Sequence, residues 1–427
     1  MNLVRTSLLS GVSALLRTGT GMLLNKVLAV YVGPTGYVAI GQFQSLVTML
    51  TTFASGGINT GVIKLTAQHN SEAERHIAIW RTAGSITATA SILVGLAIFA
   101  FRSQLANLLL RNADLSFVFI WLGASVLFLG FNGLLLAVLN GLKDVNRLVT
   151  VNITGAIFGL AVTIVAVRLW GLSGALVGVC INQALLVVAT IILCKRLPWL
   201  RIKNFFGSID FQIARELGAF ALMAATSAAV APLVQIAVRS YAIDQFGTAH
   251  AGYWEAMQRI SSTYLGLVTT TLAVYFLPRI AELSTGAEIR QEIKTTGRIV
   301  LPIVCFISIL LFLARDWTIS LLFTHDFHQM RDLFPWQLIG DVLKIGSWLY
   351  AYVLVGRAMS LPYILCELWF GAQLYVLSRV FGGLFGFEGL TIAHAINYFT
   401  YLVAMYLMFN MKFPTEDIAE HSQHPGT

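Results

Sequence analysis

Residues 333–354, LFPWQLIGDVLKIGSWLYAYVL, form an apolar run of 22 residues that carries an aspartate and a lysine near its middle. An α-helix of about 20 apolar residues crosses the roughly 30 Å hydrocarbon core of a bilayer. A charged side chain at the centre of that core costs between about 2.5 and more than 10 kcal/mol. The run therefore predicts a membrane-spanning helix in which Asp341 and Lys344 have a specific partner or task.

The rest of the chain has the same apolar character. Its 427 residues are 57% hydrophobic and only 11% charged, and its mean hydropathy is +0.76. A soluble globular protein carries about 25% charged residues. Apolar runs of spanning length recur from end to end, so we expect an all-α integral membrane protein with about twelve transmembrane helices. The predicted spans cover about 8–32, 37–63, 80–101, 115–140, 148–168, 171–194, 216–240, 251–277, 298–314, 335–356, 361–381 and 388–410.

The net charge of +8 is explained by membrane topology and not by a nucleic-acid partner. With the N-terminus in the cytoplasm, 17 lysine and arginine residues fall in cytoplasmic segments and seven, including Arg239, fall in the opposite segments. Such an excess of basic residues on one side marks the cytoplasmic face, so both termini are predicted to be cytoplasmic. Four basic residues remain within spans: Arg17, Lys26, Arg259 and Lys344.

The two halves of the chain are similar to each other. GYVAIGQFQS (36–45) and GYWEAMQRIS (252–261) share Gly, Tyr, Gln and Ser at an offset of 216 residues. Repeats with an even number of spans keep the same orientation in the membrane, an arrangement common in transporters. We expect two six-helix lobes around a central cavity. The predicted parts are lobes 1–194 and 216–410, an amphipathic linker 195–215 on the cytoplasmic leaflet, and a cytoplasmic tail 411–427.

Four polar or aromatic residues lie on one stripe of the predicted span 335–356. Residues three or four positions apart share a helix face, which aligns Gln337, Asp341, Lys344 and Trp348. In one interpretation, Asp341 and Lys344 form a structural ion pair between packed helices. In the other, the stripe lines a water-filled cavity, where Gln337, Lys344 and Trp348 bind a polar substrate and Asp341 couples transport to protons.

The first predicted span also contains two cations. Arg17 has no acidic neighbour on its own helix, and its fork of donors suits an anionic, phosphate-like ligand. Lys26 follows nine residues later and so falls on the opposite face of a straight helix. It reaches the same cavity only if Gly19 and Gly21 let the helix bend, and otherwise it extends outward to the interface.

Two further acids lie within spans. Glu255 and Arg259 are four residues apart, with the acid first, which is the favourable order for a helical pair. Both are near the outer end of their span and could instead reach water. Glu367 has no obvious partner in the sequence, and it is either a proton carrier or a protonated acid bonded to a neighbouring helix.

No motif predicts an enzyme, a metal site or a cofactor. The chain lacks a Walker sequence, a metal-ligand spacing and a G-x-S-x-G motif, and the histidines lie in predicted loops except His394.

Four stretches carry a resemblance that extends over nearly the whole chain: LAVYVGPTGY (28–37), GGINTGVIKLTAQ (56–68), YFLPRIAEL (275–283) and MRDLFPWQLIGDVLKIGSWLYAYVL (330–354). With these the sequence resembles the Wzx-type polysaccharide flippases of the MATE-like (multidrug/oligosaccharidyl-lipid/polysaccharide) exporter superfamily. Within them it is similar to the lipid III flippases of enterobacterial common antigen assembly.

The resemblance implies a flippase with two six-helix bundles around a cationic cavity. Such proteins carry an undecaprenyl-diphosphate-linked oligosaccharide, such as enterobacterial common antigen lipid III or an O-antigen unit, from the cytoplasmic to the periplasmic leaflet. Transport is by alternating access, driven by an ion gradient or the membrane potential. Arg17, Lys26, Lys344, Asp341 and Glu367 match residues that look like family features. Lys344 and Arg17 would neutralise the diphosphate.

The resemblance also implies a setting and some partners. Glu255 and Arg259 look like departures from the family, which makes them either substrate-specific or unimportant for transport. We expect a multi-pass protein of the bacterial inner membrane, with a polysaccharide polymerase and a chain-length regulator as candidate partners. Two alternatives remain: a MATE-like exporter of small molecules, and a membrane glycosyltransferase, polymerase or ligase that acts on the same lipid carrier.

Overall fold

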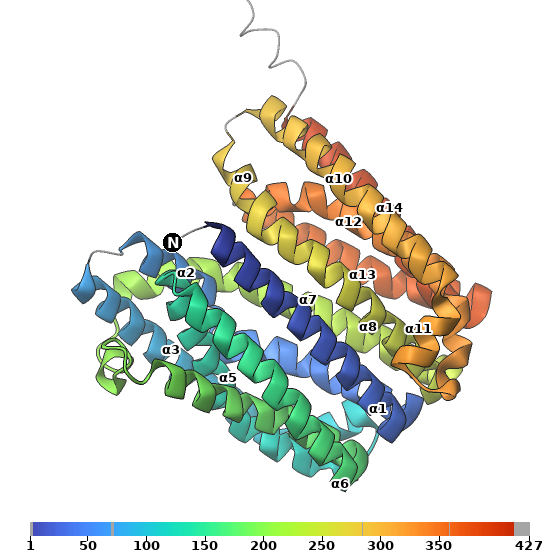
Figure 1. The fold of residues 1–427 in the computed structure, drawn as a ribbon, viewed down its shortest axis with the longest axis horizontal. Helices are drawn as coiled ribbons and strands as arrows, with labels where there is room; N and C mark the ends of the chain where they lie inside the picture. Colours follow the sequence, from blue (N-terminus) through green and yellow to red (C-terminus); the bar gives the residue numbers. More distant parts are fainter. Residues whose placement is uncertain (1–2, 70–71, 284, 358, 414–427) are drawn as a thin grey trace, which may run out of the picture. The chain divides into compact units, whose positions relative to one another are not determined.

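The computed structural model describes residues 3–69, 72–283, 285–357 and 359–413 (Figure 1). Every regular element within these ranges is a helix, which confirms the predicted fold class. Seven helices in this part of the chain are long and apolar enough to cross a membrane. Three of the seven, of 39, 50 and 53 residues, are each about long enough for two crossings. The total of twelve spans stays a prediction.

By its internal contacts the chain divides into two compact units, Met1–Ile236 and Ala237–Thr427. The main helices of the first unit are α1 (Leu3–Ala54), α2 (Asn59–Gln68), α3 (Ala73–Ala100), α5 (Ser116–Gly141) and α6 (Val145–Cys194). Between α3 and α5 lie the short α4 (Arg102–Leu105), η1 (Ala106–Leu110) and η2 (Ala113–Leu115). The helix α7 (Phe211–Phe246) crosses the division at Ile236. The predicted lobe boundaries, drawn at the linker 195–215, stay a prediction.

The second unit contains the residues of the opening sequence. Its main helices are α8 (Thr248–Thr271), α10 (Gly286–Leu313), α12 (Phe334–Gly356), α13 (Ser360–Phe385) and α14 (Gly389–Lys412). Shorter elements complete it: η4 (Leu272–Phe276), α9 (Leu277–Glu282), α11 (Arg315–Leu322), η5 (His325–Leu333) and η6 (Gly386–Glu388). The helix α12 packs against α8, α10, α13 and α14. It is therefore the central helix of this unit, and its polar stripe is surrounded by other helices.

Glycines with positive φ recur at corresponding places in the two halves. Gly33 (φ 63°) breaks α1 and Gly171 (φ 54°) breaks α6, while Gly247 (φ 88°) precedes α8 and Gly386 (φ 67°) separates α13 from α14. A left-handed backbone favours glycine because the residue has no Cβ. The later two glycines follow the earlier two after 214 and 215 residues, close to the repeat offset in the sequence. The shared breaks support a duplicated architecture.

Part of the predicted linker 195–215 packs against α3. Phe205 is buried, stacks on Trp80 of α3 and contacts Trp199 edge-on. Burial of these aromatic rings stabilises the contact between the segment and α3. Ile202 and Ile209 in the same segment are exposed, and the amphipathic linker 195–215 stays a prediction.

Candidate functional site

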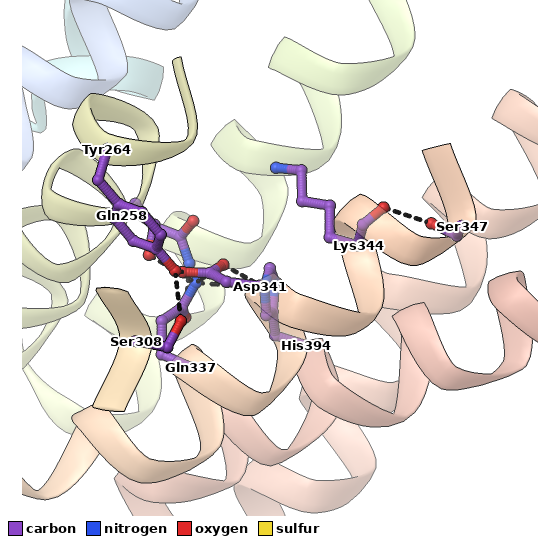
Figure 2. A network of polar contacts seen from close by, with 9 residues as sticks. Gln258, Tyr264, Ser308, Gln337, Asp341, Lys344, Ser347 and His394 are labelled. Atoms are coloured by element: carbon purple, nitrogen blue, oxygen red, sulfur yellow. Dashed lines mark hydrogen bonds and ion pairs between the residues drawn. The ribbon is translucent and has the colours of Figure 1, made fainter. Parts of the chain in front are cut away.

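The polar stripe of α12 contacts α8 and α14, and Tyr264 of α8 in turn contacts α10. Around Gln337 and Asp341 a network forms, drawn in Figure 2, that we call the polar network. It consists of Gln258, Ser261 and Tyr264 from α8, Ser308 from α10, Gln337 and Asp341 from α12, and His394 from α14. Helices far apart in the sequence thus place their polar groups at one level of the second unit.

Asp341 is fully buried, and both of its oxygens have partners. Its Oδ2 accepts a hydrogen bond from the Tyr264 hydroxyl at 2.8 Å. Its Oδ1 lies 3.2 Å from the Gln337 amide nitrogen and 3.1 Å from His394 Nε2. A buried carboxylate needs a compensating charge or a proton. Asp341 is compensated by hydrogen-bonding side chains from α8, α12 and α14.

Gln337 has more potential acceptors than hydrogens. Its Nε2 lies 3.2 Å from each of three atoms: Ser261 Oγ, Asp341 Oδ1 and His394 Nε2. An amide nitrogen has only two hydrogens, and His394 Nε2 can accept from Gln337 only when it carries no proton of its own. At most two of these three contacts are therefore hydrogen bonds from Gln337 at one time, and the tautomer of His394 decides which.

Lys344 is not paired with Asp341, which corrects one of the two interpretations of the sequence. Among the described residues no carboxylate lies within ion-pair distance of its ammonium group, and Figure 2 shows its side chain pointing away from Asp341. The ammonium lies 5.1 Å from the ring centre of Trp348 and 5.3 Å from that of Tyr398. The aromatic faces stabilise the cation without neutralising it. Asp341 is instead bonded to His394, so the two charges on α12 serve different partners.

Glu367 on α13 is partly buried and lies within electrostatic range of Lys344. No hydrogen bond or ion pair joins it to another described residue. The structure thus places the two carboxyl groups of the predicted coupling set, Asp341 and Glu367, near Lys344 from α12 and from α13.

A second cluster of buried charges lies at α7 and α8. Glu255 bonds Arg259 at 3.0 Å, which confirms the pair expected from their spacing. It also bonds Arg239 of α7, through Nη2 at 2.6 Å and Nε at 3.0 Å. Arg239 and Glu255 are 2% and 6% exposed, so neither reaches water. The Arg239–Glu255–Arg259 triad carries one net positive charge inside the unit. Arg239 was predicted to lie in a segment on the side opposite the cytoplasm, whereas the structure places it within the helix α7.

Arg17 lies on a groove in the first unit. The groove has a volume of about 390 Å³, and α1 and α6 line it with Thr20, Gln44, Asn182 and Gln183, among others. Arg17 is exposed, and within the described part of the chain no carboxylate pairs with it. A free guanidinium beside amides and hydroxyls suits an anionic or sugar-bearing ligand.

Lys26 does not line this groove. Between Leu3 and Ala54 the helix departs from helical angles only at Gly33, so Gly19 and Gly21 do not bend it. Lys26 stays on the face opposite Arg17, partly buried. Its role in binding remains a prediction.

Sequence spacing missed the residues that contact the predicted charges from other helices. His394 and Tyr264 contact Asp341 from 53 and 77 residues away, and Arg239 reaches Glu255 from the preceding helix. One signal was available: His394 was the histidine in a predicted span, where a polar group needs a partner.

Gly340 lets α14 approach the polar network, and we expect Gly340→Ala to disrupt it. A Cβ at this position would lie 2.2 Å from His394 Cδ2 and 3.1 Å from the Ala395 backbone. Overpacking of this kind costs about 1–3 kcal/mol. Thermal unfolding in detergent measures the loss. The control is Gly346→Ala on the same helix, where the nearest atom is at 3.6 Å. Equal melting temperatures for the two variants would contradict the packing.

The fold and the site together define a class of protein. A chain that is helical throughout its described residues, with two related halves and charged groups buried inside apolar helices, is a multi-pass membrane protein built like a transporter. The comparisons with known proteins specify it further. Residues 10–332 match the model of a family described as "Polysaccharide biosynthesis protein", and the chain belongs to this family.

Relatives of known name agree with this assignment. The chain is 32% identical over 370 residues to the lipid III flippase of Escherichia coli K12. The aligned region covers 86% of this chain and 88% of the relative. The lipid III flippase of Shigella flexneri gives the same values.

Solved structures of membrane transporters share the fold. An inward-facing MATE multidrug transporter matches with a TM-score of 0.75 at 15% identity, covering 95% of this chain and 99% of the transporter. The lipid II flippase MurJ, in an inward closed conformation, matches with a TM-score of 0.71 at 12% identity, covering 99% and 94%. At these identities the likeness establishes the fold alone.

Proposed function

We propose that this protein is a flippase of the inner membrane that carries an undecaprenyl-diphosphate-linked oligosaccharide from the cytoplasmic to the periplasmic leaflet. The observation that carries the proposal is the 32% identity to lipid III flippases over 86% of the chain. The protein would transport its substrate without changing it covalently. We propose that both termini are cytoplasmic, following the distribution of basic residues. The polymerase and the chain-length regulator remain predicted partners.

The environment of Lys344 supports an anionic cargo. Its ammonium is held by Trp348 and Tyr398 and is not neutralised by a described carboxylate, so it keeps donors for a phosphate oxygen. The aromatic rings beside it suit the apolar faces of sugars. Gln337 and Arg259, also predicted to bind substrate, already bond within the protein, and we assign them a supporting role.

The Asp341–His394 pair supports coupling to protons. Its two groups are 3.1 Å apart and buried, and Gln337 contacts both. Protonation of this pair would change which atoms Gln337 and Tyr264 bond, and hence how α8, α12 and α14 are held together. A proton-dependent change in helix packing is what alternating access requires. Glu367 is a second candidate for the same role.

Replacing the lipid III flippase of Escherichia coli with this chain tests the proposed function. We expect enterobacterial common antigen to reappear at the cell surface. The alternative, a MATE-like exporter, predicts no antigen and an increased efflux of small organic cations. That second outcome, with the chain present in the membrane, would overturn the proposal.

We expect Asp341→Asn to uncouple transport from the proton gradient. The amide cannot take up a proton, so flipping driven by a pH gradient should fall at least about tenfold, while undecaprenyl diphosphate binding stays within about threefold. Flipping in proteoliposomes with and without an imposed pH gradient measures the first quantity. Asp114→Asn, an exposed position, is the matched control. Equal losses of binding and flipping would instead assign Asp341 to substrate positioning.

A further inference from the structure

A groove in the second unit lies apart from the polar network, and α10, α12 and α14 line it. These three helices lie side by side in Figure 1. The groove has a volume of about 670 Å³. Arg290, Lys294 and Arg298 line it from α10, and Leu301, Gly346 and Leu402 belong to its apolar part. We call it the basic groove.

The three cations of the basic groove form a ladder. They are four residues apart, so they share one face of α10 and extend over about 12 Å. Lys294 and Arg298 are exposed. No carboxylate of the described residues lies within ion-pair distance of any of the three. The ladder therefore presents an uncompensated positive charge.

Arg290 is fixed in place by neutral partners. Its guanidinium donates to Asn410 Oδ1 at 2.7 Å and to the Phe413 carbonyl oxygen at 2.8 Å, and it lies over the Phe409 ring. These contacts orient the charge without cancelling it. The end of the ladder at Arg290 is thereby tied to the end of α14.

The apolar part of the groove begins within one turn of Arg298. Leu301 and Pro302 follow on α10, and Gly346 on α12 leaves space that a larger side chain would fill. On the neighbouring face of α10, Ile299, Ile303 and Phe306 are exposed, as expected of a helix in contact with lipid chains. Apart from the three cations and the hydroxyls of Tyr350 and Tyr406, the side chains that line the groove are apolar.

We propose that the basic groove binds an anionic phospholipid of the cytoplasmic leaflet. Its phosphate would lie at Lys294 and Arg298, and one acyl chain would follow Leu301, Gly346 and Leu402. Basic pockets between transmembrane helices on the cytoplasmic side bind anionic headgroups in this way. The apolar surface that continues from the cations favours a phospholipid over the glycosylated cargo, although the phosphate chemistry is common to both.

Lipid binding to the purified full-length chain tests the proposal. Native mass spectrometry would measure the binding of phosphatidylglycerol, phosphatidylcholine and undecaprenyl diphosphate. We expect phosphatidylglycerol to bind at least about tenfold more tightly than phosphatidylcholine. The Lys294→Gln, Arg298→Gln double variant should lose about thirtyfold, because each basic residue near an anionic lipid contributes about fivefold. The Arg201→Gln, Lys203→Gln double variant removes the same charge from exposed positions elsewhere and should change binding by less than about threefold.

A second variant tests the apolar part without changing charge. Gly346→Val should fill the groove and weaken phosphatidylglycerol binding while it leaves the cation ladder intact. Equal losses in the two charge variants, or equal affinity for phosphatidylglycerol and phosphatidylcholine, would overturn the proposal. Displacement of phosphatidylglycerol by undecaprenyl diphosphate at lower concentration would also overturn it, because the groove would then belong to the cargo. None of these results depends on whether the chain flips an oligosaccharide.

Discussion

Lys344→Gln should abolish flipping in a protein that still folds and reaches the membrane. The ammonium is held by the rings of Trp348 and Tyr398 and is not part of an ion pair with Asp341. Its loss therefore breaks no ion pair between described residues, and the fold should tolerate the change. A hydrogen bond to a charged group contributes about 2–3 kcal/mol, which corresponds to about 30- to 150-fold weaker binding of the diphosphate.

Two further variants make the Lys344 prediction specific. Lys344→Arg should retain part of the activity, because arginine also stacks on aromatic rings and bonds phosphate. The Asp341→Asn, Lys344→Gln double variant should be as inactive as Lys344→Gln alone, since the two residues have separate partners. Lys195→Gln, exposed and in the other unit, is the matched control. Restored flipping in the double variant would show that the two residues act as a structural ion pair.

Glu255→Gln should cause the largest loss of stability. The substitution removes the carboxylate that bonds the guanidinium groups of both Arg239 and Arg259. Removal of one member of a buried ion pair typically costs about 3–5 kcal/mol. The free energy of unfolding in detergent, or the yield of folded protein in the membrane, measures the effect.

The control for this prediction is Glu282→Gln. It makes the same chemical change in an exposed pair with Arg279, at 3.5 Å, and such pairs contribute about 0–1 kcal/mol. A loss of the same size in both variants would mean that the Arg239–Glu255–Arg259 triad does not stabilise the fold. A stable but inactive Glu255→Gln protein would assign the triad to transport.

Much of the fold was predictable because the bilayer restricts the backbone structures that a spanning segment can form. In hydrocarbon every backbone polar group must be bonded internally, so long apolar runs become helices. Gly33 falls in the predicted gap between spans 8–32 and 37–63, and Gly171 is the first residue of the predicted span 171–194. Glycine permits the left-handed backbone at both breaks. The burial of Phe205 was not predictable in the same way, because it depends on contact with Trp80 of a helix distant in the sequence.

The site was predictable only in part, for a physical reason. Spacing along a helix identifies neighbours on the same face, and this sufficed for Glu255 and Arg259. The same spacing suggested that Asp341 and Lys344 pair with each other. In the structure they contact His394 and Tyr398 of α14 instead. Contacts between helices depend on packing, which one sequence does not reveal. A buried charge could be identified in the sequence, but the group that compensates it could not.

Flipping of a lipid-linked oligosaccharide by the purified protein tests the central claim most directly. Proteoliposomes would contain the chain and a fluorescent undecaprenyl-diphosphate-linked trisaccharide, and a membrane-impermeant quencher would report the leaflet that holds the sugar. We predict translocation that requires an imposed proton gradient and is lost in Lys344→Gln. Translocation equal to that of protein-free vesicles, by a folded wild-type protein under the same gradient, would contradict the account.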